Sequence, residues 1–137
     1  MFQCEEGTIK PIVYVGVVKD KKLLLVQYDQ SPNPSKLGWW IPAPGLKFGE
    51  DPATVAAQVV DQLGLTASAV VLKGVETFVT HGGWHLIYHY VAQANSEPAL
   101  VSENIQATRW VSAGELSQMK NIAHGQWEID LGLDYLS

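Results

Sequence analysis

The stretch WWIPAPGLKFGEDPATVAAQVVDQLGL, residues 39–65, contains the clearest helix signal in the chain. Asp51 stands where a helix N-cap belongs, because its carboxylate can accept a hydrogen bond from a free N–H group of the first turn. Pro52 suits the first helical position, and Gly64 suits the position after the C-cap. These signals predict a helix that begins after Asp51 and ends just before Gly64.

The residues between these signals divide into an apolar and a polar face. The apolar positions recur with the spacing of one side of a helix: Val55, Ala56, Val59, Val60 and Leu63. The opposite side is polar: Thr54, Gln58, Asp61 and Gln62. The pattern therefore predicts an amphipathic helix that packs through its apolar face.

Two β-rich runs precede this helix. Residues 12–18 (IVYVGVV) and 23–28 (LLLVQY) flank the charged turn at residues 19–22 (KDKK), an arrangement typical of a β-hairpin. A polar loop with two prolines follows at residues 29–38. Such a loop is expected at the surface, where it could cover a site.

Further strands follow the helix. Residues 67–80 and 85–94 are predicted strands on either side of a glycine turn at residues 81–84, and residues 105–111 form a third. Ser112 is followed three residues later by a glutamate, which is the capping-box spacing that opens a helix.

The tail, residues 127–136, predicts a last helix. The order of strands, helix, strands and helices predicts an α/β fold with helices packed on a mixed sheet. No internal repeat or linker divides the chain, so we expect a single domain over residues 1–137.

Composition excludes several classes of protein. Hydrophobic residues make up 47% of the chain and charged residues 17%, values typical of a globular protein rather than a disordered one. The formal net charge is -5, which disfavours a nucleic-acid partner, because phosphate backbones are bound by clustered lysine and arginine. A small phosphorylated ligand held by one or two cations, or by a metal, remains compatible with this charge.

Cys4 is the only cysteine, so no disulfide can form within the chain and no cysteine cluster can bind zinc. The first residues lack the basic segment and long apolar run of a signal peptide. No apolar run approaches the roughly 20 residues of a membrane-spanning helix. We therefore expect a cytoplasmic protein with no membrane partner.

Several of these segments resemble the Nudix (MutT-like) hydrolase superfamily. The family motif is entered through a tryptophan–proline segment, matched here by Trp39, Trp40 and Pro42, and Phe48-Gly49-Glu50 stands where the family has x-G-E. Gly64-Leu65 matches the end of the motif. Residues 103–116 (ENIQATRWVSAGEL) are similar to the family's penultimate strand and turn. The resemblance covers nearly the whole chain and implies the Nudix α/β/α sandwich with a mixed β-sheet.

The resemblance also implies a chemistry. Nudix enzymes hydrolyse a nucleoside diphosphate linked to another moiety, and Mg²⁺ or Mn²⁺ neutralises the phosphate oxygens. Hard cations of this kind prefer carboxylate ligands. The family supplies them as three glutamates at i, i+3 and i+4 of the helix, where they share one face.

This chain departs from the family pattern at those positions. With Gly64 as the anchor, the three ligand positions fall on Gln58, Asp61 and Gln62, and only Asp61 is charged. The interval from Glu50 to the helix end is one residue shorter than in the family. With Glu50 as the anchor, the positions become Val59, Gln62 and Leu63, two of them on the apolar face, so the Gly64 register is preferred.

Other positions of the motif differ as well. The family arginine is replaced by Ala57, and its two glycines by Ala43 and Pro44. Because Mg²⁺ gives up its water reluctantly for neutral ligands, we expect metal affinity to be reduced by orders of magnitude.

Two functional hypotheses follow from the resemblance. In the first, the chain is a weak, metal-dependent hydrolase in which Glu50 and Asp61 are catalytic and bind Mg²⁺ or Mn²⁺, with Gln58 and Gln62 completing the metal site. In the second, the chain is an inactive Nudix-fold domain that binds a nucleotide, a nucleotide sugar or a protein partner. For Glu50 an alternative role is to accept backbone hydrogen bonds at the helix start.

Trp40, Trp84 and His81 are the candidate substrate-binding residues, because aromatic rings can stack on a base and a histidine can contact a phosphate. The alternative is a core position for Trp40 and a surface turn for His81. His85 and His89 share one face of a strand about 13 Å apart, too far for one zinc ion. Homodimerisation is common in the family and is a possibility here.

Overall fold

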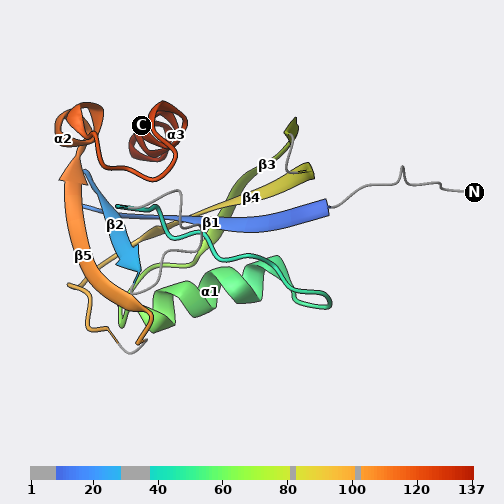
Figure 1. Cartoon of the computed structure of the whole chain (residues 1–137). Helices are drawn as coiled ribbons and strands as arrows, with labels where there is room; N and C mark the ends of the chain where they lie inside the picture. The colour runs from blue at the N-terminus through green and yellow to red at the C-terminus, as the bar shows by residue number, and fades with distance from the viewer. Residues whose placement is uncertain (1–8, 29–37, 81–82, 101–102) are drawn as a thin grey trace, which may run out of the picture.

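The computed structural model describes residues 9–28, 38–80, 83–100 and 103–137, and these form a three-layer α/β/α sandwich. A five-stranded sheet with the order β3-β4-β1-β2-β5 lies between α1 on one face and α2 and α3 on the other (Figure 1). The elements in chain order are β1 (Ile9–Lys19), β2 (Lys22–Tyr28), α1 (Pro52–Gln62), β3 (Val71–Thr80), β4 (Gly83–Gln93), β5 (Ile105–Ser112), α2 (Ala113–Gln118) and α3 (Gln126–Leu136). The predicted fold class is confirmed.

The sheet is mixed. β1 and β4 run parallel along ten paired positions, whereas the other neighbouring strands are antiparallel. β1 and β2 form the predicted hairpin around Asp20 and Lys21, both of which have positive φ angles. These two strands pair only beside the turn, at Val18 with Leu23 and at Lys19 with Lys22, and then diverge.

Residues 39–46, the tryptophan–proline segment, fill the gap between the diverging strands. On one side, the N–H groups of Val13 and Val15 donate to the carbonyls of Pro44 and Pro42 at 3.0 and 2.9 Å. On the other side, the backbones of Trp40 and Val26 exchange two hydrogen bonds of 2.8 Å. The segment therefore joins the two halves of the sheet, and it leads directly into the turn before α1.

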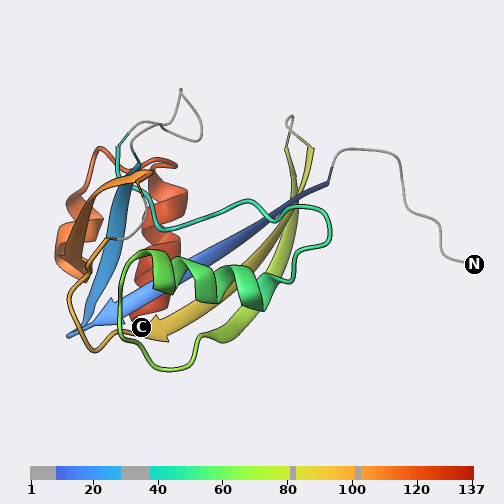
Figure 2. The ribbon, with the colours of Figure 1, turned by 90° about the horizontal axis from the view of Figure 1, so that it is seen from below.

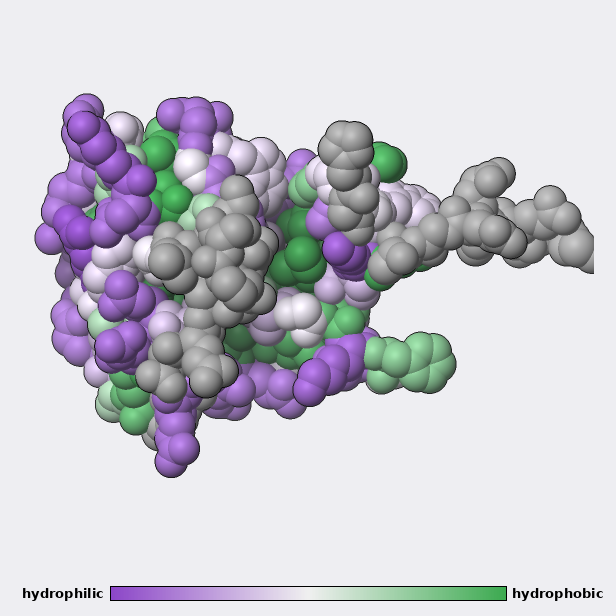
Figure 3. All heavy atoms as spheres, in the orientation of Figure 1, coloured by the Kyte–Doolittle hydropathy of each residue, from purple (hydrophilic) through white to green (hydrophobic). Residues whose placement is uncertain are grey.

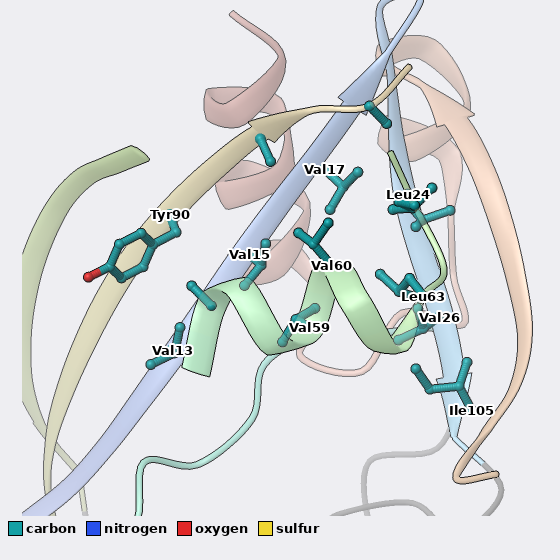
Figure 4. Close-up of a cluster of buried hydrophobic side chains, with 14 of the residues drawn as sticks. Val13, Val15, Val17, Leu24, Val26, Val59, Val60, Leu63, Tyr90 and Ile105 are labelled. Carbon is teal, nitrogen blue, oxygen red and sulfur yellow. The ribbon is translucent and has the colours of Figure 1, made fainter. Parts of the chain in front are cut away.

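Alternation along β1 separates two apolar cores. Val13, Val15 and Val17 point toward α1 and pack with Val59 and Val60, as Figure 4 shows. The intervening residues face the α2–α3 layer. Figure 2 shows α1 lying across the opposite face of the sheet.

Local capping explains where the helices begin and end. Asp51 is the N-cap of α1, and its Oδ2 accepts the Thr54 N–H at 3.1 Å. The helix ends before Gly64, whose φ of +65° terminates it as predicted. Ser112 and Glu115 form the predicted capping box of α2, with hydrogen bonds of 3.0 and 3.2 Å.

The helix predicted for residues 127–136 is α3, which begins one residue earlier. None of the helices in the part of the chain that the structure describes is long and apolar enough to cross a membrane.

Candidate functional site

The outer face of α1 carries the three residues predicted to replace the family's metal ligands. Gln58, Asp61 and Gln62 are all exposed. Val59 and Leu63, which the competing register would use as ligands, are only 6% and 0% exposed. The competing register would therefore place two of its three ligand positions in the core.

Glu50 lies in the turn before α1, where its Oε1 accepts the backbone N–H of Lys47 at 2.6 Å. This contact stabilises the turn. The alternative role considered for Glu50 was to accept N–H groups at the start of the helix, whereas the observed donor, Lys47, lies before the helix. No group of three or more histidine, cysteine or acidic side chains among the described residues could hold a metal ion. As the side chains stand, with Asp61 as the single carboxylate on α1, they do not fit a divalent cation.

The predicted substrate-binding tryptophans lie in different surroundings. Trp40 is only 6% exposed, and its ring contacts Tyr28 and His124 edge-on at centroid distances of 6.1 and 4.9 Å. This packing corrects the expectation that Trp40 binds substrate, because no face of its ring is open to a ligand. Trp84 is 41% exposed, and alternation along β4 places it on the α1 side of the sheet. His81 lies outside the described residues.

A cavity of about 870 Å³ opens on the other face of the sheet, beyond the end of α3. Figure 3 shows hydrophobic side chains recessed between the helical layer and the far half of the sheet. The cavity is lined by alternate residues of β1, β3 and β4 together with His124 and Trp127. Its volume lies within the range of small-molecule sites.

Aromatic rings form much of the cavity wall. Phe78 is stacked on His85 with centroids 4.9 Å apart and an interplanar angle of 23°. Trp127 meets Phe78 and Tyr14 edge-on, at 5.9 and 5.6 Å. Rings held in this way offer flat apolar surfaces for a planar ligand. Lys10 is the one cation among the described lining residues.

A fully buried carboxylate lies behind the cavity. Glu128 is 0% exposed and accepts the Ile41 backbone N–H at 3.2 Å through Oε2, and its Oε1 lies 2.9 Å from His124 Nδ1. The Tyr14 hydroxyl also hydrogen-bonds to this carboxylate. Burial, with a smaller contribution from the charge of Glu128, raises the pKa of Tyr14 well above its usual range.

A second group of hydrogen-bonded side chains, Tyr135, His89 and Glu76, lies on the same face of the sheet. His89 is buried, with Nδ1 2.5 Å from the Tyr135 hydroxyl and Nε2 2.9 Å from Glu76 Oε1. Burial, followed by the charge of Asp134, raises the pKa of Tyr135 well above its usual range, so this hydroxyl stays protonated and can donate to His89. Both ring nitrogens of His89 are therefore engaged.

The fold can be compared with solved structures. A Nudix hydrolase from Nitrosomonas europaea superposes with a TM-score of 0.73 over 93% of this chain and 88% of its own, at 20% identity. The chain has the Nudix fold. A MutT protein from Methanosarcina mazei Go1 shares the Nudix fold at a TM-score of 0.72 and 17% identity, with 96% of each chain covered.

A third protein with the Nudix fold is a bifunctional NMN adenylyltransferase/ADP-ribose pyrophosphatase from Francisella tularensis, solved with AMP and a manganese ion. Its TM-score is 0.70 at 15% identity, and the match covers 98% of this chain and 44% of that one. No protein-family model matches the chain, and no curated protein matches it. The similarity between this chain and the three solved structures is therefore a similarity of fold.

In this Nudix fold, the outer face of α1 and the cavity are separate. The buried side of α1 packs on Val13 and Val15, whereas Ile12 and Tyr14 of the same strand line the cavity. Alternation places these two pairs on opposite faces of the sheet. None of the predicted metal-binding residues lines the cavity.

Sequence reasoning missed the residues that build the cavity. The spacing of His124 and Glu128 was the one signal that could have predicted a contact, because residues at i and i+4 near the start of a helix can lie side by side. Phe78 and Glu76 lie two residues apart in β3, which places them on one face. The face that they share could be recognised only from the register with β4 and β1.

Proposed function

We propose that this chain binds a small nucleotide-type ligand, such as a nucleoside diphosphate linked to a second group, in the cavity on the α3 side of the sheet. We propose also that any hydrolysis of this ligand with Mg²⁺ or Mn²⁺ is very slow. The observation that carries the proposal is the contrast between a well-formed aromatic cavity and a helix face with one carboxylate.

The cavity chemistry supports the ligand class. Phe78 and Trp127 offer ring surfaces to a nucleobase, and Lys10 can neutralise part of the charge of a phosphate. Glu76 and His124 add polar groups that could select among ligands. The Nudix-fold protein from Francisella tularensis, which was solved with AMP, supports a nucleotide as the first class of ligand to try.

Weak hydrolysis is the second candidate activity. Gln58, Asp61 and Gln62 keep the i, i+3, i+4 spacing on an exposed face, so a metal ion in solution can reach them. Two neutral amides and one carboxylate are nevertheless a poor set for Mg²⁺, which favours carboxylates and its own water. The donor set therefore favours binding over cleavage.

Phosphorus NMR over a panel of nucleoside triphosphates, nucleotide sugars, ADP-ribose and dinucleoside polyphosphates tests this proposal. We expect turnover below about 0.01 s⁻¹ with Mg²⁺ or Mn²⁺, against a median on the order of 10 s⁻¹ for enzymes. Asp61→Asn and Glu50→Gln should change this residual rate little more than the exposed control Glu103→Gln.

Turnover on the order of 1 s⁻¹ or more, abolished by Asp61→Asn and unaffected by Glu103→Gln, would contradict the proposal. That result would show that α1 assembles a working metal site when metal and ligand are present together.

A further inference from the structure

We propose that Glu128 holds His124 in the tautomer with its proton on Nδ1, so that Nε2 accepts a hydrogen bond from a hydroxyl or N–H group of the ligand. This inference rests on the proposed function, because it concerns the same cavity. His124 is then a specificity-determining residue, and Glu128 is a positioning residue that acts through it.

The surroundings of Glu128 determine its role. Its carboxylate is fully buried and meets the Ile41 N–H, the Tyr14 hydroxyl and His124 Nδ1. A buried carboxylate is tolerated when several donors satisfy its oxygens, and an ionised carboxylate can only accept hydrogen bonds. With Glu128 ionised and His124 neutral, His124 donates from Nδ1, which leaves Nε2 as an acceptor.

The ring of His124 is held on its Nδ1 side and is partly exposed at the cavity. Its Nδ1 edge is directed at a carboxylate with no exposed surface, and Trp40 and Trp127 meet the ring edge-on, at centroid distances of 4.9 and 5.9 Å. The side chain still has 30% of its surface exposed and lines the cavity. Because Nδ1 is taken by Glu128, Nε2 is the ring nitrogen that this partly exposed side chain can offer to a ligand.

The other cavity-side histidines differ from His124 in one respect. His85 Nε2 lies 2.9 Å from Thr80 Oγ1, and both nitrogens of His89 are engaged by Glu76 and Tyr135. No residue in the described ranges hydrogen-bonds to Nε2 of His124. Among the described histidines on this face, His124 is the one whose Nδ1 is held by a fully buried carboxylate.

An acceptor fixed in this way discriminates between ligands. A ligand with a hydroxyl or N–H group opposite Nε2 gains a hydrogen bond, and one without that group does not. The donor can come from the sugar or from the base, and paired ligands that differ in one donor distinguish these sources.

Glu128→Gln is the decisive variant because it should reverse the tautomer. The Ile41 N–H is a fixed backbone donor, so the single amide oxygen of glutamine should face it. The amide NH₂ then faces His124 and donates to Nδ1, which moves the ring proton to Nε2. Nε2 becomes a donor, while the size of the residue is unchanged.

The first measurement is the tautomer of His124 by two-bond nitrogen–proton correlation NMR at about pH 8, where an unperturbed histidine is neutral. We expect the proton on Nδ1 in the wild-type chain and on Nε2 in Glu128→Gln. The matched control is Glu97→Gln, which removes an exposed carboxylate bonded to Trp110 and should leave the His124 tautomer unchanged. A wild-type ring protonated on Nε2 would overturn the inference without any variant.

The second measurement compares calorimetric affinities for ADP, 2′-deoxy-ADP, 3′-deoxy-ADP and inosine diphosphate. For the wild-type chain, loss of one donor should weaken binding about 3- to 10-fold, the range expected for one hydrogen bond. A deoxy ligand identifies a sugar donor, and inosine diphosphate identifies the base amino group. The discrimination should disappear in His124→Phe, which keeps a ring but has no nitrogen. In Glu128→Gln a preference for the base amino group should be lost or reversed, whereas a sugar hydroxyl can still bond to Nε2 by accepting from it.

The outcomes separate this inference from the proposed function. If ADP binds but the wild-type chain and His124→Phe discriminate equally, the inference fails and the proposed function stands. If none of the four nucleotides binds the wild-type chain, the proposed function fails and this inference fails with it.

Discussion

Replacing Gly64 by alanine is expected to lower the free energy of unfolding by about 3–5 kcal/mol, the range of the most damaging single substitutions. Gly64 has a φ of +65°, and a Cβ built there would lie 1.8 Å from the carbonyl oxygen of Ala99. Because the obstacle is backbone, either the end of α1 or the loop at Ala99 must move. The loop is itself tied to the helix by the hydrogen bond from Ala99 N–H to the Leu63 carbonyl.

Gly49→Ala is the matched control for this prediction. Its φ of +85° is also positive, but no atom of the described residues beyond its chain neighbours lies within 4 Å of its built Cβ. It should therefore cost only the backbone strain of a left-handed residue, about 1–2 kcal/mol. Urea unfolding measures both values. Equal losses for the two variants would contradict the close contact between the end of α1 and Ala99.

The double variant Gln58→Glu, Gln62→Glu is expected to raise the affinity for Mn²⁺ about 100-fold or more. Two added carboxylates would join Asp61 on one exposed face at i, i+3 and i+4, which is a favourable set for a hard cation. Without metal, the like charges should lower the helix stability by a few tenths of a kcal/mol per pair. Addition of Mn²⁺ should restore this loss.

Titration of Mn²⁺ followed by electron paramagnetic resonance measures the affinity directly, because the signal of the free ion falls on binding. The control is Gln106→Glu, Gln118→Glu, which adds the same charge at exposed positions on β5 and α2. Unchanged Mn²⁺ affinity, or an equal rise in the control, would show that the face of Gln58, Asp61 and Gln62 is not the remnant of a metal site.

The elements that could be predicted from the sequence are those with local signals. Asp51 caps α1 through a residue three positions away, and Ser112 and Glu115 cap α2 across the same interval. The turn after β1 likewise depends on a few adjacent residues. In each case the deciding contact lies within one turn of chain, so the sequence alone contains the information.

The burial of Trp40 could not be predicted from local sequence signals. Trp39 and Trp40 are adjacent, and no local pattern distinguishes them, yet Trp40 is buried against His124 and Tyr28. The partner His124 is more than eighty residues away along the chain. The burial of Trp40 depends on how residues 39–46 fill the gap between β1 and β2, which is a property of the whole sheet.

The candidate ligand cavity could not be predicted from the sequence either, because its residues are far apart in the chain and meet only in the folded protein. The hydrogen bond between Ile41 and Glu128 joins residues 87 positions apart. Phe78, Tyr14 and Trp127 come from three elements that meet only in the folded sheet and its covering helix. The predicted polar face of α1, by contrast, follows from helical periodicity alone.

Calorimetric titration of ADP-ribose in the presence of EDTA distinguishes binding in the cavity from binding through a metal ion on α1. We expect metal-independent binding that Trp127→Ala weakens about tenfold or more, a loss of roughly 1.4 kcal/mol. The matched control Trp84→Ala, an exposed tryptophan on the other face of the sheet, should bind as the wild-type chain does. If binding instead requires Mg²⁺ or Mn²⁺, is lost in Asp61→Asn and is unchanged in Trp127→Ala, the ligand site is the face of α1 and not the cavity.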